Sequence, residues 1–384
     1  MNITEILVQP QAIAWLPWAV QYFFYIGSAY AAAILFLLSY IFRAHTSHYL
    51  RSALVLTMSI GAVVGPLALT GDLHQPGRAL HFYSNMTPWS WMSLGSLFLP
   101  LFSALAILTA WLYLRDDIAK LKHSDNAIAK KISLFSLGDW QTTSTQMITV
   151  TVLTCLSGLT IALYTGAEIY VVQSRPLWHQ PAAPLLWFVT AFIGAIGFAL
   201  LLLALFPIPA KANAFTQSDQ GLIKRALLVS AILAAVLLPI WASNNASFSL
   251  YESDAWLVRL GSLAVSFLAC MGIALLASKI ALYNRPQLLI MSAISLICCW
   301  YLRWVTIMDV QTIAKFDQGP YPYELPMGSA GLLGILGMAG LWLALALAAS
   351  EIVAIQEKSV KSVKRVKSVK NSTVSQPLKT QHTQ

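Results

Sequence analysis

The sequence predicts an all-α, polytopic integral membrane protein: a bundle of nine transmembrane helices. Three observations predict it: 58% hydrophobic against 10% charged residues, nine long apolar stretches, and positive charges that fall mostly on one side of those stretches. A soluble domain carries about a quarter charged residues. The chain is therefore expected to lie in a lipid bilayer.

The nine stretches follow one another with mostly short connections. Each has the ~20 residues that a helix needs to cross the hydrocarbon layer. Short connections are typical of antiparallel neighbours in a bundle. The expected spans are, in order, Trp15–Phe42, Ser52–Gly71, Trp89–Leu114, Met147–Gln173, Ala182–Pro207, Ala226–Tyr251, Ala255–Ser278, Pro286–Asp309 and Met327–Ser350.

The positive charges predict the orientation. Of the 24 Lys and Arg residues, 19 fall in every second connection or in the C-terminal tail. Cytoplasmic loops carry such an excess, so we expect the N-terminus outside and the C-terminus in the cytoplasm. The net charge of +9 then reflects topology and contact with anionic lipid, and no nucleic-acid partner is expected.

Three regions are expected along the chain: an external N-terminus at 1–14, a transmembrane domain at 15–355, and a basic, disordered cytoplasmic tail at 356–384. Arg115–Thr145 is the one long internal connection, with some helix expected in Asp116–Ile132. A glycine at every third position of the last span predicts close approach of a neighbouring helix. These are Gly328, Gly331, Gly334, Gly337 and Gly340.

Cysteine and histidine positions argue against metal cofactors in this chain. All four cysteines lie inside apolar stretches without a C-x-x-C pair, which favours packing residues over a zinc or iron–sulfur site. The seven histidines lie in loops, at span ends or in the tail. Haem b needs axial ligands inside the helices, so no haem is expected.

Ionisable residues gather at the outer ends of the spans. Glu168 lies about one turn from the end of the fourth span, and Tyr164 shares its helical face; Arg303 lies near the end of the eighth. An ionisable group in a span raises the free energy of membrane insertion by roughly 2.5–3.5 kcal/mol, so such a residue is expected to have a charged partner or a function. One interpretation is a Glu168–Arg303 ion pair that joins two helices.

The neighbouring external segments add further polar groups. Gln21 and Tyr22 lie near the outer end of the first span, and Asp72 and His74 follow the second. A quinol needs such a rim, because its tail prefers lipid while its head exchanges protons with carboxylates, His or Tyr. Two other hypotheses remain. One is a secondary transporter, with helices broken at Pro100, Pro207 or Pro239; the other is a purely structural anchor.

The same segments resemble a known family. They include Trp15–Phe24, Gly65–Gln75, Thr87–Met92, Tyr164–Trp178, Arg303–Trp304 and Val310–Phe316. In order and spacing they resemble the NrfD/PsrC family, the quinone-interacting membrane subunits of polysulfide reductase-like molybdoenzymes. Within it the resemblance is greatest to the membrane subunits of tetrathionate reductases. The Arg115–Thr145 connection and the basic tail depart from the family pattern.

This resemblance implies a multi-pass inner-membrane protein of anaerobic respiration. The chain would oxidise menaquinol or ubiquinol and anchor a four-cluster, ferredoxin-like iron–sulfur subunit on the external face. A molybdopterin subunit beyond it would reduce tetrathionate, or polysulfide in a related enzyme, so this chain performs no tetrathionate chemistry. The resemblance assigns Glu168 and Asp72 to catalysis. It assigns contacts with the quinol to Gln21, His74 and Tyr164, and Tyr22 and Arg303 are further candidates because they lie at the same outer level.

Overall fold

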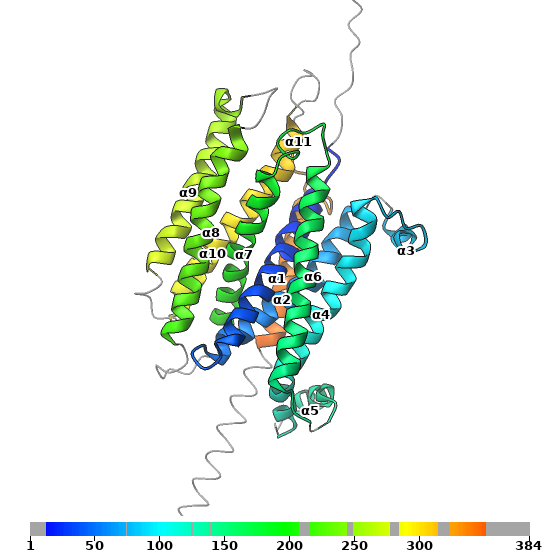
Figure 1. Ribbon diagram of the computed structural model, residues 1–384, viewed down its shortest axis with the longest axis vertical. Helices are drawn as coiled ribbons and strands as arrows, with labels where there is room; N and C mark the ends of the chain where they lie inside the picture. The colour runs from blue at the N-terminus through cyan, green and yellow to red at the C-terminus, as the bar shows by residue number, and fades with distance from the viewer. Residues whose placement is uncertain are drawn as a thin grey trace, which may run out of the picture.

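The computed structural model describes residues 13–73, 75–123, 126–138, 140–206, 216–243, 249–276, 284–313 and 323–350. Within these ranges nine helices are long and apolar enough to cross a membrane, which confirms the expected architecture. They are α1 (Pro17–Ile41), α2 (His48–Asp72), α4 (Trp91–Lys120), α6 (Ser144–Tyr170), α7 (Ala182–Leu205), α8 (Gln217–Ser243), α9 (Asp254–Leu276), α10 (Arg285–Trp304) and a last helix, Leu332–Ser350 (Figure 1).

Short elements connect or extend the long helices. Near the start of α4 lie η1 (Pro76–Arg78) and α3 (His81–Ser84), and after α4 lie η2 (Leu121–His123), α5 (Ala127–Ser133) and η3 (Leu134–Ser136). The turn η4 (Leu250–Glu252) precedes α9. Helix α10 continues through a π-helical segment, η5 (Val305–Asp309), into α11 (Val310–Thr312).

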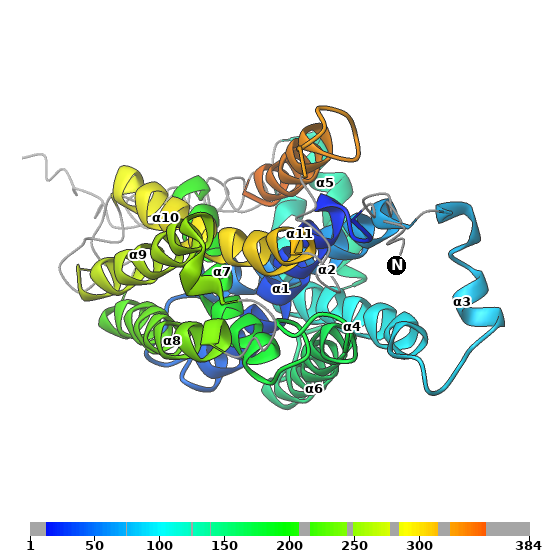
Figure 2. The ribbon, with the colours of Figure 1, turned by 90° about the horizontal axis from the view of Figure 1, so that it is seen from above.

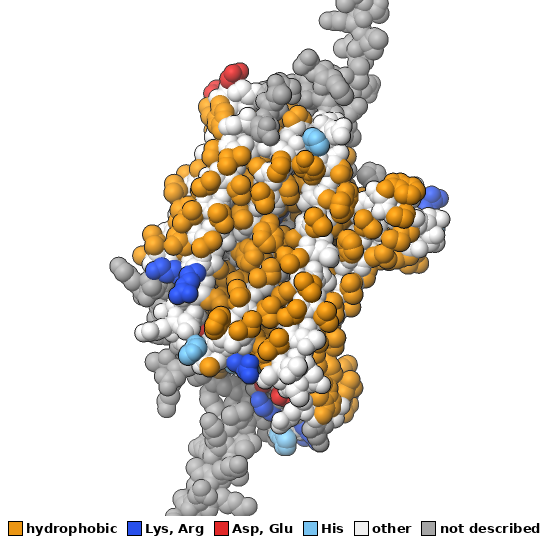
Figure 3. Space-filling model, viewed as in Figure 1, with side chains coloured by type: hydrophobic (Ala, Val, Ile, Leu, Met, Phe, Trp, Pro, Cys, Tyr) orange, Lys and Arg blue, Asp and Glu red, His pale blue; other side chains and the backbone are white. Residues whose placement is uncertain are grey.

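The long helices alternate in direction, so the bundle has two distinct ends. We call one the site end, where α1 and α4 begin and α2 and α6 finish; it lies at the top of Figure 1. The other is the basic end, where α1 finishes and α2 and α8 begin. Figure 3 shows an apolar surface between the ends, with most of the visible Lys and Arg near the basic end.

Helix α1 lies at the centre of the bundle and packs against α2, α6, α7 and α10 (Figure 2). Its approach to α2 is close because glycines of α2 face it. A β-carbon at Gly61 would lie 2.8 Å from the Tyr25 carbonyl oxygen, and one at Gly65 would lie 3.2 Å from the Ile26 backbone nitrogen. Small residues four apart are a common means of close helix packing in membranes.

Helix α8 begins at Gln217, well before the predicted Ala226. The carboxylate of Asp219 accounts for this early start. It accepts hydrogen bonds from the backbone N–H groups of Thr216 (2.8 Å) and Ser47 (2.9 Å) and is completely buried. This cap begins the helix in polar sequence that an apolar pattern does not include, and it also joins α8 to the start of α2.

The prolines do not break the helices as the transporter hypothesis requires. Pro100 lies inside a continuous α4, and Pro239 lies inside a continuous α8. Pro207 lies outside the described residues. The described helices therefore give no support to paired unwound spans.

The long internal connection folds around Arg115. This arginine, expected in a polar loop, is 1% exposed and donates hydrogen bonds to the carbonyl oxygens of Ser136 (2.9 Å) and Gly138 (2.6 Å). Its guanidinium also lies 3.8 Å from the centre of the Trp140 ring. Gly138 has a positive φ of 103°, which a residue with a side chain rarely adopts. The buried Arg115 side chain thus holds this connection in its folded shape at the basic end.

The glycine strip of the last helix is only partly a packing surface. A β-carbon at Gly334 would lie 2.9 Å from the Trp18 ring, and one at Gly331 would overlap the Pro326 carbonyl. Gly328, Gly337 and Gly340 have no atom of the described chain within 4 Å of such a carbon. The expected close approach along the whole strip is therefore wrong within the described residues.

Candidate functional site

A polar cluster lies between α1 and α6 at the site end. Tyr22 comes from α1, while Tyr164 and Glu168 lie one turn apart on the same face of α6. The three side chains are 0%, 1% and 8% exposed. Tyr164 lies close enough to interact with both Tyr22 and Glu168. The structure therefore brings together three of the residues expected from the sequence, and we call them the Tyr–Tyr–Glu cluster.

Several polar atoms of this region are buried without a hydrogen-bond partner in the described part of the chain. They are the Tyr22 hydroxyl, Glu168 Oε2 and Nε2 of the neighbouring Gln21, which is itself 2% exposed. A buried polar group without a partner costs about 1–3 kcal/mol. Of these atoms, the Tyr22 hydroxyl and Glu168 Oε2 lie on the two sides of Tyr164, where a polar ligand would complete their hydrogen bonds.

Asp72 borders the Tyr–Tyr–Glu cluster and holds the start of α1. Its Oδ1 accepts a hydrogen bond of 3.0 Å from the backbone N–H of Leu16, the residue that precedes α1. A carboxylate there also interacts favourably with the positive end of the helix dipole. Asp72 lies within electrostatic range of Glu168. His74, another expected site residue, lies outside the described residues.

Arg303 lies deeper in the bundle than the cluster. It is 1% exposed, and its guanidinium donates hydrogen bonds to the Trp187 carbonyl (2.7 Å) and to the Thr190 hydroxyl, both on α7. A β-carbon at Gly27 of α1 would lie 3.5 Å from this guanidinium. Gly27 is five residues beyond Tyr22, roughly 7.5 Å further along α1.

The proposed Glu168–Arg303 ion pair does not occur. The ion pairs among the described residues join other groups, such as Arg259 and Asp309 (3.0 Å), which link α9 to η5. Arg303 is thus held by a carbonyl and a hydroxyl, and its Nε has no hydrogen-bond partner in the described chain. The ion-pair interpretation is wrong, because α7 lies against Arg303 and provides its hydrogen-bond acceptors.

Gly95 of α4 is a site residue that the sequence did not reveal. The Tyr164 ring lies against it so closely that any β-carbon at this position would overlap the ring. The lack of a side chain at Gly95 therefore allows Tyr164 to take its position. Nothing distinguishes this glycine from others in an apolar helix, so sequence pattern offered no signal.

Gln311 and the residues around η5 fix the entry to α1. Gln311 is 1% exposed; its Oε1 accepts from the backbone N–H groups of Ala14 (3.0 Å) and Trp15 (2.9 Å). Thr306 within η5 accepts hydrogen bonds from two indole N–H groups. The Trp178 indole donates to its carbonyl (2.5 Å), and the Trp187 indole donates to its hydroxyl (2.8 Å). A π-helical turn is often found at functional sites. Here its polar groups are satisfied by the loop after α6 and by α7.

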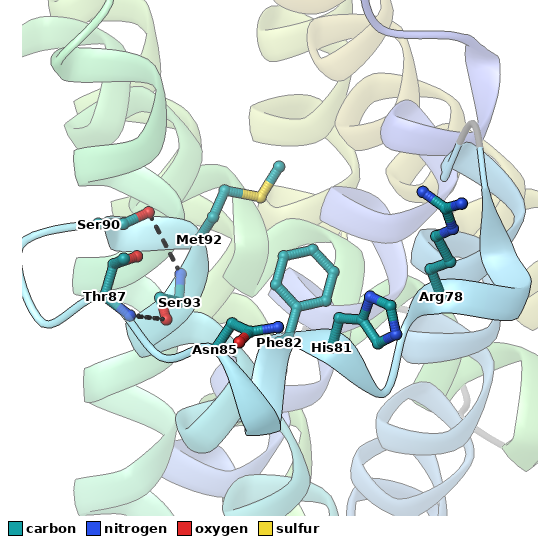
Figure 4. A pocket seen from close by; sticks show the side chains of 8 residues that line it. All are labelled: Arg78, His81, Phe82, Asn85, Thr87, Ser90, Met92 and Ser93. Carbon is teal, nitrogen blue, oxygen red and sulfur yellow. Dashed lines mark hydrogen bonds between the residues drawn. The ribbon is translucent and has the colours of Figure 1, made fainter.

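The segment before α4 forms a hollow at the site end. The cavity has a volume of about 270 Å³. Figure 4 shows Phe82 between His81 and Met92, with Arg78 beyond the histidine. The segment is held to α4 because the Thr87 backbone N–H donates to the Ser93 hydroxyl at 2.9 Å. In Figure 2 this segment extends away from the bundle, and apolar side chains such as Leu80 and Trp89 are exposed on it.

Comparisons with known proteins identify the family of this chain. A family model described as "Polysulphide reductase, NrfD" matches residues 6–315, which include all elements from α1 to α11. A tetrathionate reductase subunit of Salmonella typhimurium is 35% identical over 354 residues, covering 89% of this chain and 93% of that protein. The chain is thus a multi-span membrane protein that belongs to the NrfD family of polysulphide reductase subunits.

Proposed function

We propose that this chain oxidises quinol at the Tyr–Tyr–Glu cluster and passes the electrons to an iron–sulfur subunit bound at the site end. The observation that carries the proposal is the set of buried atoms without partners: Gln21 Nε2, the Tyr22 hydroxyl and Glu168 Oε2. A cluster used only for packing would leave these atoms uncompensated. A quinol head fits them because it has hydroxyl groups that both donate and accept hydrogen bonds.

Each residue has a role that its chemistry supports. Quinol supplies two electrons and two protons. The Glu168 carboxylate accepts a hydrogen bond from a quinol hydroxyl and takes its proton as a general base. The Tyr22 hydroxyl and the Gln21 amide donate to quinol oxygens and orient the ring. Tyr164, between Tyr22 and Glu168, holds the two sides of the cluster in position.

Asp72 provides the next acceptor for protons. It is half-buried and lies within electrostatic range of Glu168, at the end of α2 where the chain leaves the bundle. A proton taken by Glu168 would therefore leave toward the site end. The partners follow from the relative: as a tetrathionate reductase subunit, it works within a complex. We propose that this chain anchors a comparable molybdoenzyme, whose catalytic subunit reduces tetrathionate.

The direct test is Glu168→Gln in the assembled complex. The variant keeps shape and much of the hydrogen bonding but removes the base, so quinol-linked tetrathionate reduction should fall roughly 10²–10⁴-fold. Reduction from a viologen donor should stay near normal, because those electrons bypass this subunit. Glu252→Gln is the matched control, since Glu252 is an exposed carboxylate at the same end. Full quinol-linked turnover in Glu168→Gln would refute the proposal.

A further inference from the structure

A second, apolar cavity lies on the side of the bundle, between α1, α7 and α8. Its volume is about 710 Å³, and none of its lining residues belongs to the Tyr–Tyr–Glu cluster. Leu38 of α1, Phe192 of α7 and Leu233 of α8 are among the apolar side chains that form its walls. We call it the lateral groove.

The lateral groove is long enough for an acyl chain. Its lining along α8 runs from Gln217 to Leu233, which corresponds to roughly 24 Å at 1.5 Å per residue. Half the hydrocarbon layer of a bilayer is about 15 Å thick. The groove thus runs from the basic end over a length greater than half the hydrocarbon layer, along the direction that a lipid tail takes.

The lower part of the groove is polar and basic. Arg225, His45, Gln217 and Ser218 line it there. The carboxylate nearest in sequence, Asp219, does not line the groove, because it is buried against the backbone of Ser47 and Thr216. No acidic residue lies among the lining residues. This part of the groove therefore favours an anion.

Arg225 is available to bind an external anion. It is exposed, and none of the ion pairs among the described residues includes it. It lies eight residues into α8, roughly 12 Å from the start of the helix. An arginine facing hydrocarbon costs roughly 2.5–3.5 kcal/mol unless its head reaches a polar group. A lipid phosphate at that depth would supply charge and hydrogen-bond acceptors for the planar guanidinium.

We infer that the lateral groove is a binding site for an anionic phospholipid. The phosphate lies between Arg225 and His45, and one acyl chain runs along Leu38, Phe192 and Leu233. A zwitterionic lipid fits less well, because its ammonium group finds no carboxylate among the lining residues. An uncharged polyprenyl molecule would fill the apolar part but leave Arg225 without a counter-charge.

Two variants test the two halves of the site. Arg225→Gln removes the charge, and Lys224→Gln is its control, because Lys224 is the adjacent cation but does not line the groove. Gly221→Leu obstructs the lower groove: a β-carbon there meets no atom within 4 Å, so the side chain enters open space. Gly272→Leu is its control, at an equally open glycine of α9 outside the groove.

The measurement is native mass spectrometry of the purified full-length chain with phosphatidylglycerol or phosphatidylethanolamine. We expect the wild type and both controls to retain phosphatidylglycerol at least tenfold more strongly than phosphatidylethanolamine. Arg225→Gln should reduce this preference to near equality, and Gly221→Leu should reduce retention of both lipids. Equal retention of the two lipids by the wild type would overturn the inference. So would unchanged phosphatidylglycerol retention in either groove variant, or retention of a polyprenyl quinone in place of phospholipid.

Discussion

The Tyr164 ring lies on the backbone of α4 at Gly95, where no other residue type leaves room for it. This contact positions Tyr164 from a helix that contributes no polar group to the Tyr–Tyr–Glu cluster. Because Tyr164 lies between Tyr22 and Glu168, a shift of its ring would change the distance between the two sides of the cluster. Small displacements of this kind can cost about 10²-fold in rate.

Gly95→Ala should therefore lower quinol-linked turnover by roughly ten- to a hundredfold. Gly337→Ala is the matched control, because its β-carbon would meet no described atom within 4 Å. Both substitutions raise helix propensity by up to about 1 kcal/mol, so a difference between them reports the displaced tyrosine. Steady-state kinetics with quinol and viologen donors distinguish a site effect from failed assembly. Equal turnover in the two variants would show that the ring adapts.

Asp72 has a structural and a chemical role that two substitutions separate. Asp72→Asn keeps a side-chain oxygen for the Leu16 N–H, so its melting temperature should stay near that of the wild type. Its quinol-linked turnover should fall, because an amide does not take up a proton. Asp72→Ala loses both functions and should also lose about 1 kcal/mol of stability, the usual net contribution of one hydrogen bond. If Asp72→Asn retains full turnover, the carboxylate serves only the helix.

Arg303 should tolerate methionine better than lysine. Methionine keeps the apolar stem and removes a cation that has no carboxylate partner, an insertion cost of roughly 2.5–3.5 kcal/mol. The Thr190 hydroxyl still donates to the Leu186 carbonyl at 2.6 Å. Lysine keeps the charge but lacks the planar guanidinium, whose two terminal nitrogens donate to Trp187 and Thr190 at the same time. Thermal unfolding in detergent should rank Arg303→Met at or above the wild type and Arg303→Lys below both; the reverse order would contradict this account.

The orientation of the bundle also remains a prediction. Reporter fusions after Gln141, at the basic end, should report the cytoplasm, and fusions after His179, at the site end, should report the periplasm. The reason is the excess of Lys and Arg at the basic end. Alkaline phosphatase and green fluorescent protein fusions give opposite signals in the two compartments, so each serves as the other's control. Reversed signals at both positions would place the polar cluster on the cytoplasmic side.

The fold was predictable because apolar length alone identifies a membrane span. The start of α8 was not, because polar residues around Asp219 form its first turns. Within the site, the spacing of Tyr164 and Glu168 correctly placed them on one face. Their approach to Tyr22 depends on packing between distant helices, and so does the contact of Tyr164 with Gly95. Arg303 shows the same difficulty, since its hydrogen-bond acceptors come from the backbone and a threonine of α7.

Because of the π-helical segment η5, the contacts at the site end depend more on the number of residues in this segment than on their types. A π-helical turn accommodates more residues than an α-helical turn over the same path. Deleting one residue from Val305–Asp309 would restore an ordinary α-helical turn over the same path, whereas inserting one further residue would turn everything after it by about 100° relative to the residues before it. Asp309 would then leave Arg259, and Gln311 would leave the chain that enters α1. Substitutions within η5 are a milder change, so single-residue insertions are the mutations that this part of the sequence should tolerate least.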